Sequence, residues 1–224
     1  MPERSSIFDM IGPVMIGPSS SHTAGVVRIG RAATAILGDV PDKAEILFYN
    51  SFARTYEGHG SDRAIIAGLL NFQTDDKRIK EAFEHAQNTG LTYIFRSIGN
   101  ASTHHPNTIK LNISKGAKSV EVVGVSKGGG VIEIEEVNGF HASFSGGANT
   151  LIVVAQDRKG SIAFIANILA NDDCNIATMT VSRRGKNQTA CLIFETDSEL
   201  RPLSLEYIRA LPWVEQVIDV PILS

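Results

Sequence analysis

The chain has 224 residues, of which 43% are hydrophobic and 20% charged, and its formal net charge is −3. This length suffices for one large domain or two small ones with a real hydrophobic core. The weak net charge argues against nucleic acid or an anionic membrane as a partner. The apolar runs are far shorter than the ~20 residues of a membrane span, and the start, MPERSSIFDM, lacks the apolar core of a signal peptide. We therefore expect a cytoplasmic protein.

The first part of the chain alternates helix-like and strand-like segments. Apolar spacing predicts helices at residues 26–37, 64–70 and 78–88, and strands at 45–50, 91–97, 108–114, 119–125 and 131–136. The glycines at 128–130 belong to the turn between the last two strands. This part is therefore predicted to be α+β, and its polar motifs fall in loops between elements, where function usually resides.

A short polar stretch, SFSGGANT, has the composition of a domain linker. We place the boundary at Gly147, which gives a first domain of residues 1–147 and a second of residues 148–224. In the second domain the pattern predicts a strand at 151–155, a helix at 161–171, strands at 175–181 and 190–196, a helix at 203–211 and a strand at 214–220. The order β-α-β-β-α-β is the ferredoxin-like arrangement, one antiparallel sheet with two helices on one face.

The stretch GPSSSHTAG, residues 17–25, directly precedes the predicted helix 26–37. One hydroxyl is explained as a helix cap, because Ser and Thr accept hydrogen bonds from exposed N–H groups. The remaining polar side chains surround a helix N-terminus, where N–H groups and the helix dipole favour a carboxylate or phosphate; they are Ser20, Ser21, His22 and Thr23. Capping and anion binding both remain open, whereas a serine hydrolase is disfavoured because the G-x-S-x-G elbow is missing.

Two further loops contain histidines. In GHGSD, Ser61 or Asp62 can cap the following helix, but capping does not explain His59, whose glycine neighbours leave its ring open to a ligand. His59 is either a general base or orienting donor, or a solvated loop residue. In HHPNT, Pro106 favours an extended His105, and ordinary turn chemistry is an equal alternative to a functional role for this loop.

The sequence contains two cysteines, Cys174 and Cys191, without a metal-site spacing. Alone they cannot form the ligand set of a zinc ion or an iron–sulfur cluster. We interpret them as reduced, half-buried thiols.

In combination, GPSSSHT, GHGSD, HHPNT and the GGG hairpin resemble the β chain of the iron–sulfur-dependent L-serine dehydratases, from residue 6 to about 149. Residues 151–223 resemble an ACT domain, a regulatory ferredoxin-like module. The resemblance implies an enzyme that converts L-serine to pyruvate and ammonia without pyridoxal phosphate, with a [4Fe–4S] cluster whose open iron acts as a Lewis acid. Because two cysteines cannot ligate such a cluster, it should lie on a separate α chain, without which this chain should be inactive.

The resemblance also implies roles for matching positions. His59 would be the proton-transfer group, with His22 as a second catalytic residue, beside the substrate carboxylate and the cluster. The substrate would be bound by residues of the first two loops, namely Ser20, Ser21, Thr23, Gly60 and Ser61, the last standing where the family often has threonine. Supporting or interface roles would fall to His104, His105 and Asn107.

A rival interpretation is a stand-alone amino-acid-sensing module. The first domain is also similar to the allosteric substrate-binding domain of some phosphoglycerate dehydrogenases, so the same loops could bind an effector. ACT modules commonly bind amino acids before the first helix; here Asp157, Gly160 and Asn175 could line such a site or a monovalent cation site, although Lys159 stands where proline is frequent. ACT modules also often pair, which implies a homodimer, and an exposed sheet edge favours such pairing.

Overall fold

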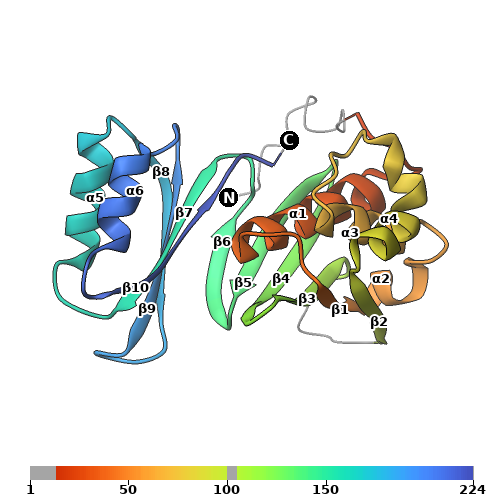
Figure 1. Cartoon of the computed structure of the whole chain (residues 1–224), viewed down its shortest axis with the longest axis horizontal. Helices are drawn as coiled ribbons and strands as arrows, with labels where there is room; N and C mark the ends of the chain where they lie inside the picture. The colour runs from red at the N-terminus through yellow and green to blue at the C-terminus, as the bar shows by residue number, and fades with distance from the viewer. Residues whose placement is uncertain (1–13, 100–104, 224) are drawn as a thin grey trace.

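A computed structural model of the chain describes residues 14–99 and 105–223, and its strands form two sheets (Figure 1). The strands of the first sheet are β1 (Lys43–Tyr49), β2 (Thr92–Ile98), β3 (Thr108–Lys115), β4 (Lys118–Gly128), β5 (Val131–Val137) and β6 (Phe140–Phe144). They lie in the order β2-β1-β3-β4-β5-β6. The β1–β2 pair is parallel, whereas the other pairs in this sheet are antiparallel.

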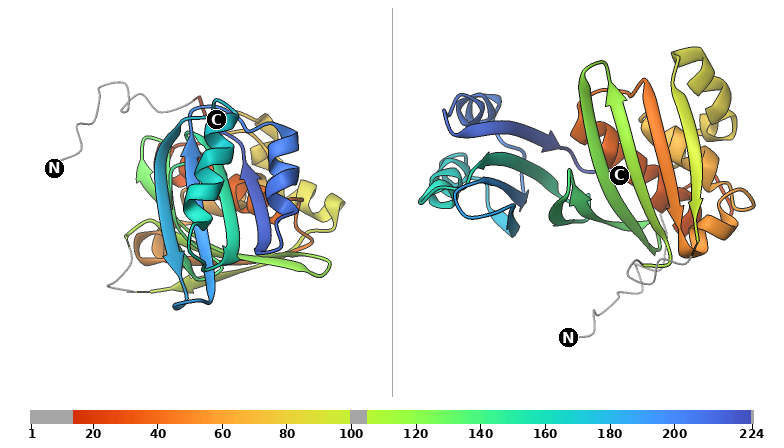
Figure 2. Two further views of the ribbon diagram at one scale, coloured as in Figure 1. Left: turned by 90° about the vertical axis from the view of Figure 1, so that its left-hand side faces the viewer. Right: turned by 90° about the horizontal axis from the view of Figure 1, so that it is seen from below.

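Helices cover one face of this six-stranded sheet (Figures 1 and 2). They are α1 (Gly25–Leu37), α2 (Asn50–Thr55), α3 (Ser61–Leu69) and α4 (Ala82–Thr89). Alternate strand residues such as Ile46, Phe48 and Leu111 are buried toward the helices. Several residues of the opposite face are charged and form cross-strand ion pairs, including Lys110 with Glu121 at 2.7 Å. The period of two thus separates a core face from a charged face.

Helices α1 and α3 cross at two glycines. A Cβ atom on Gly68 would lie 2.3 Å from the carbonyl oxygen of Val27 and 2.9 Å from Cα of Gly30. The absence of side chains at Gly30 and Gly68 therefore lets the two backbones touch. Because a polar loop precedes each helix, this crossing sets the distance between the two loops.

The second sheet contains β7 (Asn149–Gln156), β8 (Ile176–Arg183), β9 (Thr189–Thr196) and β10 (Val214–Val220), in the order β10-β7-β9-β8. Helices α5 (Ser161–Asn171) and α6 (Pro202–Arg209) pack on its outer face (Figure 1). The element order confirms the expected ferredoxin-like arrangement, and the two sheets confirm the α+β class.

Both faces of the four-stranded sheet are buried in part. Leu151 and Val153 of β7 join the cluster under α5 and α6, whereas Ile152 between them joins the core of the six-stranded unit. The core therefore continues from one sheet to the other. The connection between β6 and β7 spans residues 145–148, and a domain boundary at residue 147 stays a prediction.

Several local expectations were wrong. Strand β1 ends at Tyr49, because Asn50 takes a left-handed φ of 51° and the chain turns into α2, which was not expected. The predicted helix 78–88 is a 3₁₀ turn, η3 (Lys77–Glu81), followed by α4. Strand β6 was not predicted either. In the part of the chain that the structure describes, no helix is long and apolar enough to cross a membrane.

Candidate functional site

The first polar loop enters α1 through one turn of π-helix, η2 (Ser20–Ala24). The hydroxyl of Ser19 accepts a hydrogen bond from the backbone N–H of His22 at 3.3 Å, so a serine does cap this turn. Thr23 is buried, and its side chain occupies the space where a Cβ on Gly17 would lie. The capping interpretation of this stretch is confirmed at Ser19.

The second loop follows helix α2 rather than a strand, and the expected cap of α3 was wrong. Gly60, with a φ of 72°, is the N-cap residue of α3, and no side chain caps it. Glycine adopts this left-handed conformation without steric cost. The hydroxyl of Ser61 is instead buried and donates to the carbonyl oxygen of His22 at 3.0 Å, and a carboxylate oxygen of Asp62 accepts from the N–H of Arg63. Ser61 thereby joins the second loop to the first.

His22 and His59 lie side by side, with ring centroids 4.6 Å apart and an interplanar angle of 38°. The rings of His22 and Phe52 also make an edge contact, with their centroids 4.8 Å apart. Burial, and then the charge on neighbouring His59, lower the pKa of His22 below its ordinary value. Both effects favour the neutral form of the His22 ring. His59 is exposed, so its ring is open to a substrate or to a partner chain.

Polar partners hold both rings. Nδ1 of His22 lies 3.1 Å from Oγ of Ser21 and 3.3 Å from Oγ of Ser19. Nε2 of His22 lies 3.1 Å from Oγ1 of Thr55. Nδ1 of His59 lies 3.3 Å from the carbonyl oxygen of the same Thr55. The last residue of α2 thus contacts both histidines.

The third loop packs against the first through Ser126 of β4. The side-chain amide of Asn107 donates to the carbonyl oxygen of Ser126 at 3.3 Å, and the Ser126 hydroxyl donates to the carbonyl oxygen of Ser21 at 2.9 Å. Nδ1 of His105 accepts from the N–H of Asn107 at 3.1 Å. His104 lies outside the described residues. The three loops are therefore neighbours.

Sequence reasoning missed Thr55 and Phe52, which contact the His22 ring, and Ser126, which binds the carbonyl oxygen of Ser21. No predicted element covered residues 51–57, and a single Thr or Ser in a helix or strand carries no signal of its own. The one available clue is spacing, because Thr55 precedes His59 by four residues, which places its carbonyl within reach of the His59 backbone N–H in a helical turn.

The candidate residues of the ferredoxin-like unit do not meet. Asp157 follows β7 and accepts from Arg183 at 3.1 Å and from the N–H of Asn187 at 3.0 Å, and these hydrogen bonds, that of Asn187 first, lower its pKa. Asn175 precedes β8 at the other end of the sheet and donates to Asp197 at 2.7 Å. Gly160, with a φ of 84°, is the N-cap residue of α5. In one chain, Asp157 and Asn175 therefore lie at opposite ends of a strand pair.

The described residues do not fit an iron–sulfur cluster. They contain no group of three or more His, Cys, Asp or Glu that could hold a metal ion. Cys174 and Cys191 are buried in the ferredoxin-like unit, not beside His22 and His59. Burial raises the pKa of Cys191 to about 11, which disfavours the thiolate that a metal requires.

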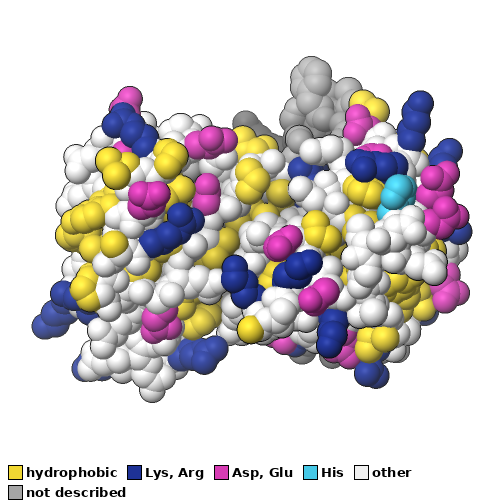
Figure 3. Space-filling view, in the orientation of Figure 1, with side chains coloured by type: hydrophobic (Ala, Val, Ile, Leu, Met, Phe, Trp, Pro, Cys, Tyr) yellow, Lys and Arg dark blue, Asp and Glu magenta, His cyan; other side chains and the backbone are white. Residues whose placement is uncertain are grey.

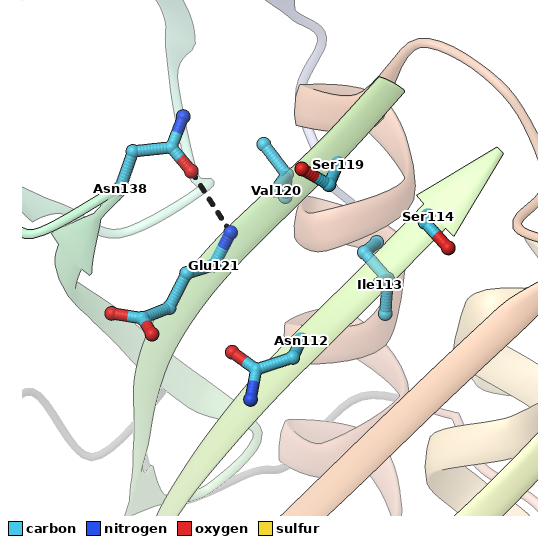
Figure 4. A pocket seen from close by; sticks show the side chains of 7 residues that line it. All are labelled: Asn112, Ile113, Ser114, Ser119, Val120, Glu121 and Asn138. Carbon is cyan, nitrogen blue, oxygen red and sulfur yellow. Dashed lines mark hydrogen bonds between the residues drawn. The ribbon is translucent and has the colours of Figure 1, made fainter. Parts of the chain in front are cut away.

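A shallow hollow elsewhere on the six-stranded sheet lies between β3, β4 and the β5–β6 turn (Figure 4). Its lining includes Asn112, Ser119, Glu121 and Asn138. Asn138 accepts from the N–H of Glu121 at 2.9 Å, so its amide oxygen already has a partner. None of the residues singled out in the sequence lines this hollow.

Comparisons with known proteins agree with the family resemblance that the three loops indicated in the sequence. Residues 6–93 match the family model described as serine dehydratase beta chain. The chain is 46% identical over 215 residues to the probable L-serine dehydratase, beta chain, of Bacillus subtilis, which covers 96% of this chain and 97% of that protein. It is 36% identical over 196 residues to the L-serine dehydratase, beta chain, of Peptoniphilus asaccharolyticus, which covers 87% and 88%.

A shorter match of 90 residues, 32% identical, links the chain to D-3-phosphoglycerate dehydrogenase of Bacillus subtilis, over 39% of this chain and 17% of that enzyme. The first two relatives, in contrast, align over nearly their whole length. By this similarity, the chain belongs to the family of L-serine dehydratase beta chains.

Proposed function

We propose that this chain is the β subunit of an L-serine dehydratase, which deaminates L-serine to pyruvate and ammonia in the cytoplasm. The observation that carries the proposal is the pair of neighbouring rings, His22 and His59, at the junction of three polar loops. The names of the two long relatives supply the reaction, and the loops supply groups suited to it.

Deamination of serine requires a base for the proton on Cα. His59 suits this role, because its ring is exposed and Nδ1 already has a partner, which leaves Nε2 to take the proton. Ser20 and Ser21 lie in η2, the turn that enters α1, where hydroxyl and N–H donors favour a carboxylate. Thr23, Ser61 and Gly60 shape the loops, and a direct contact of these residues with substrate stays a prediction.

The proposed cofactor, a [4Fe–4S] cluster, belongs to a separate α chain. This assignment is supported by the buried cysteines, which leave the chain without a cluster ligand set among its described residues. We derive no chemical step through the cluster. The exposed His59 and His105 would then face the α chain, with Asn107 and His104 in supporting or interface roles.

A homodimer through the ferredoxin-like unit is part of the proposal. Strand β8 is an edge of its sheet and exposes Met179 and Val181. Hydrophobic side chains also gather over α5 and α6 (Figure 3), where Ile162, Phe164 and Tyr207 are exposed. Pairing of two chains would bring an end of the four-stranded sheet of one chain close to an end of the same sheet in the other chain. An effector or monovalent cation site at Asp157, Gly160 or Asn175 remains a prediction.

The test is anaerobic co-expression of the chain with its cysteine-rich α chain, followed by an assay of pyruvate formed from L-serine. We expect activity only with both chains present. His59→Ala should lower kcat roughly hundredfold or more, the usual contribution of a general base. The matched control is His141→Ala, because His141 is an exposed histidine of β6. Full activity of His59→Ala in a normally assembled enzyme would contradict the catalytic role.

The match to phosphoglycerate dehydrogenase favours a second candidate, a stand-alone amino-acid sensor. Calorimetry separates the two functions. Tight binding of L-serine to the chain alone would support the sensor, whereas binding that requires the α chain would support a shared active site.

A further inference from the structure

Thr55 belongs to none of the three polar motifs, yet it touches both histidines from the end of α2. We propose that Thr55 is a positioning residue that fixes the tautomers of His22 and His59 and thereby leaves Nε2 of His59 as the free basic nitrogen. The catalytic meaning of this arrangement rests on the proposed function. The tautomers themselves follow from the contacts of this chain.

The tautomer of His22 is set by the Thr55 hydroxyl. That hydroxyl donates its single hydrogen to the carbonyl oxygen of Ser51 at 2.9 Å, because a carbonyl can only accept. Oγ1 of Thr55 is then an acceptor toward Nε2 of His22, 3.1 Å away. His22 therefore carries its proton on Nε2, and its unprotonated Nδ1 accepts from the nearby serine hydroxyls.

The tautomer of His59 is set by the Thr55 backbone. The carbonyl oxygen of Thr55 lies 3.3 Å from Nδ1 of His59 and can only accept, so Nδ1 carries the proton. Nε2 of His59 is then the unprotonated nitrogen, and among the described residues it has no hydrogen-bond partner. The two rings thus carry opposite tautomers.

This arrangement suits a base that must take one proton. When Nε2 of His59 accepts a proton, the Thr55 carbonyl already holds Nδ1–H and stabilises the positive charge. His22 stays neutral beside it, since its Nε2–H is bound by Thr55 and its Nδ1 receives a hydroxyl hydrogen. A neutral neighbour is required, because two charged rings 4.6 Å apart would repel each other.

The tautomers can be observed directly by NMR of the imidazole nitrogens, in the full chain labelled with ¹⁵N-histidine at a pH where both rings are neutral. In the wild type, we expect a protonated Nε2 in His22 and a protonated Nδ1 in His59. Thr55→Val removes the hydroxyl but keeps the carbonyl, so the His22 signals should shift toward the other tautomer while those of His59 stay. Thr55→Ser should restore the wild-type spectrum.

The matched control is Thr89→Val. Thr89 makes the same kind of hydrogen bond to the carbonyl four residues earlier, that of His85, but lies in α4 away from His22 and His59. This variant should leave the signals of both rings unchanged. A general loss of helix stability would affect both variants, whereas loss of the hydrogen bond between Oγ1 of Thr55 and Nε2 of His22 affects Thr55→Val alone.

The same variants, assembled with the α chain, test the catalytic meaning. Thr55→Val should lower kcat about tenfold, as expected for one lost hydrogen bond to a catalytic unit, with little change in KM, and Thr55→Ser should recover it. Wild-type spectra with the opposite tautomers, or an unchanged spectrum or kcat in Thr55→Val, would overturn the proposal. If the wild-type assembly forms no pyruvate, the proposed function fails, and the spectra alone decide whether Thr55 fixes the tautomers.

Discussion

The glycine crossing of α1 and α3 makes a quantitative prediction for Gly68→Ala. In an open helix, this change would stabilise the protein by about 1 kcal/mol, because alanine is the better helix former. Here the new Cβ would lie 2.3 Å from the carbonyl oxygen of Val27, a backbone atom that cannot rotate away. Forcing the helices apart costs about 3 kcal/mol. The expected net loss in the free energy of unfolding is therefore about 2 kcal/mol.

Urea unfolding followed by circular dichroism measures this loss. With a slope of about 2 kcal/mol per molar urea, the midpoint should fall by about 1 M. Gly99→Ala is the control, because a Cβ at Gly99 meets no atom within 4 Å and its φ is not positive. A Gly68→Ala midpoint that rises by about 0.5 M, as helix propensity alone requires, would refute the proposed close contact.

Three further predictions concern the site and the cysteines. Because burial and then the charge on His59 lower the pKa of His22 below its usual 6.5, the unfolded chain binds that proton more tightly. The contribution of His22 to stability is then complete above about pH 6.5 and is lost as the pH falls toward the pKa of His22 in the folded chain. His22→Gln should therefore reduce the difference between the urea midpoints measured at about pH 7.5 and at about pH 5.5. Ser126→Ala should lower the free energy of unfolding by about 1–2 kcal/mol, since it leaves the carbonyl of Ser21 without its donor. The control in the same urea experiment is Ser143→Ala, which removes a serine hydroxyl from β6 that binds Glu133. Ellman's reagent at about pH 8 should label neither Cys174 nor Cys191 in the folded chain, but both in urea. The reason is that both thiols are buried in the folded chain and that burial raises the pKa of Cys191 to about 11. Rapid labelling of Cys191 in the folded chain would contradict its burial.

Hydrophobic periodicity predicted the ferredoxin-like unit well. The predicted bounds of α5 and β10 agree with the structure, and those of the other four elements differ by at most two residues. Here the central strands β7 and β9 are continuous apolar runs buried on both faces, and α5 carries a buried apolar stripe, so local pattern and tertiary burial agree. Strand β6 was missed although its five residues alternate in burial, because its end overlaps the polar stretch that was interpreted as a linker. Helix α2 was missed because it is too short to show a helical period.

The loops of the site were recognisable because polar residues between glycines stand out in the sequence. The contacts that join the loops were not, because they connect residues far apart in the chain. Thr55 reaches His22 over 33 positions, and Ser126 reaches Ser21 over 105. Such pairs are fixed by the packing of α1 on β4 and of α1 on α3, which no local pattern encodes.

The hydroxyl groups of the first loop divide by their partners. Ser19 caps the π-helical turn, Ser21 lies against Nδ1 of His22, and Thr23 is buried next to Gly17. Among the described residues, the side chain of Ser20 has no hydrogen-bond partner, and it is only half-buried. The serine-rich stretch is therefore mostly a scaffold that orients His22. Of its four hydroxyl groups, that of Ser20 remains available to a substrate carboxylate without breaking a contact that holds the loop.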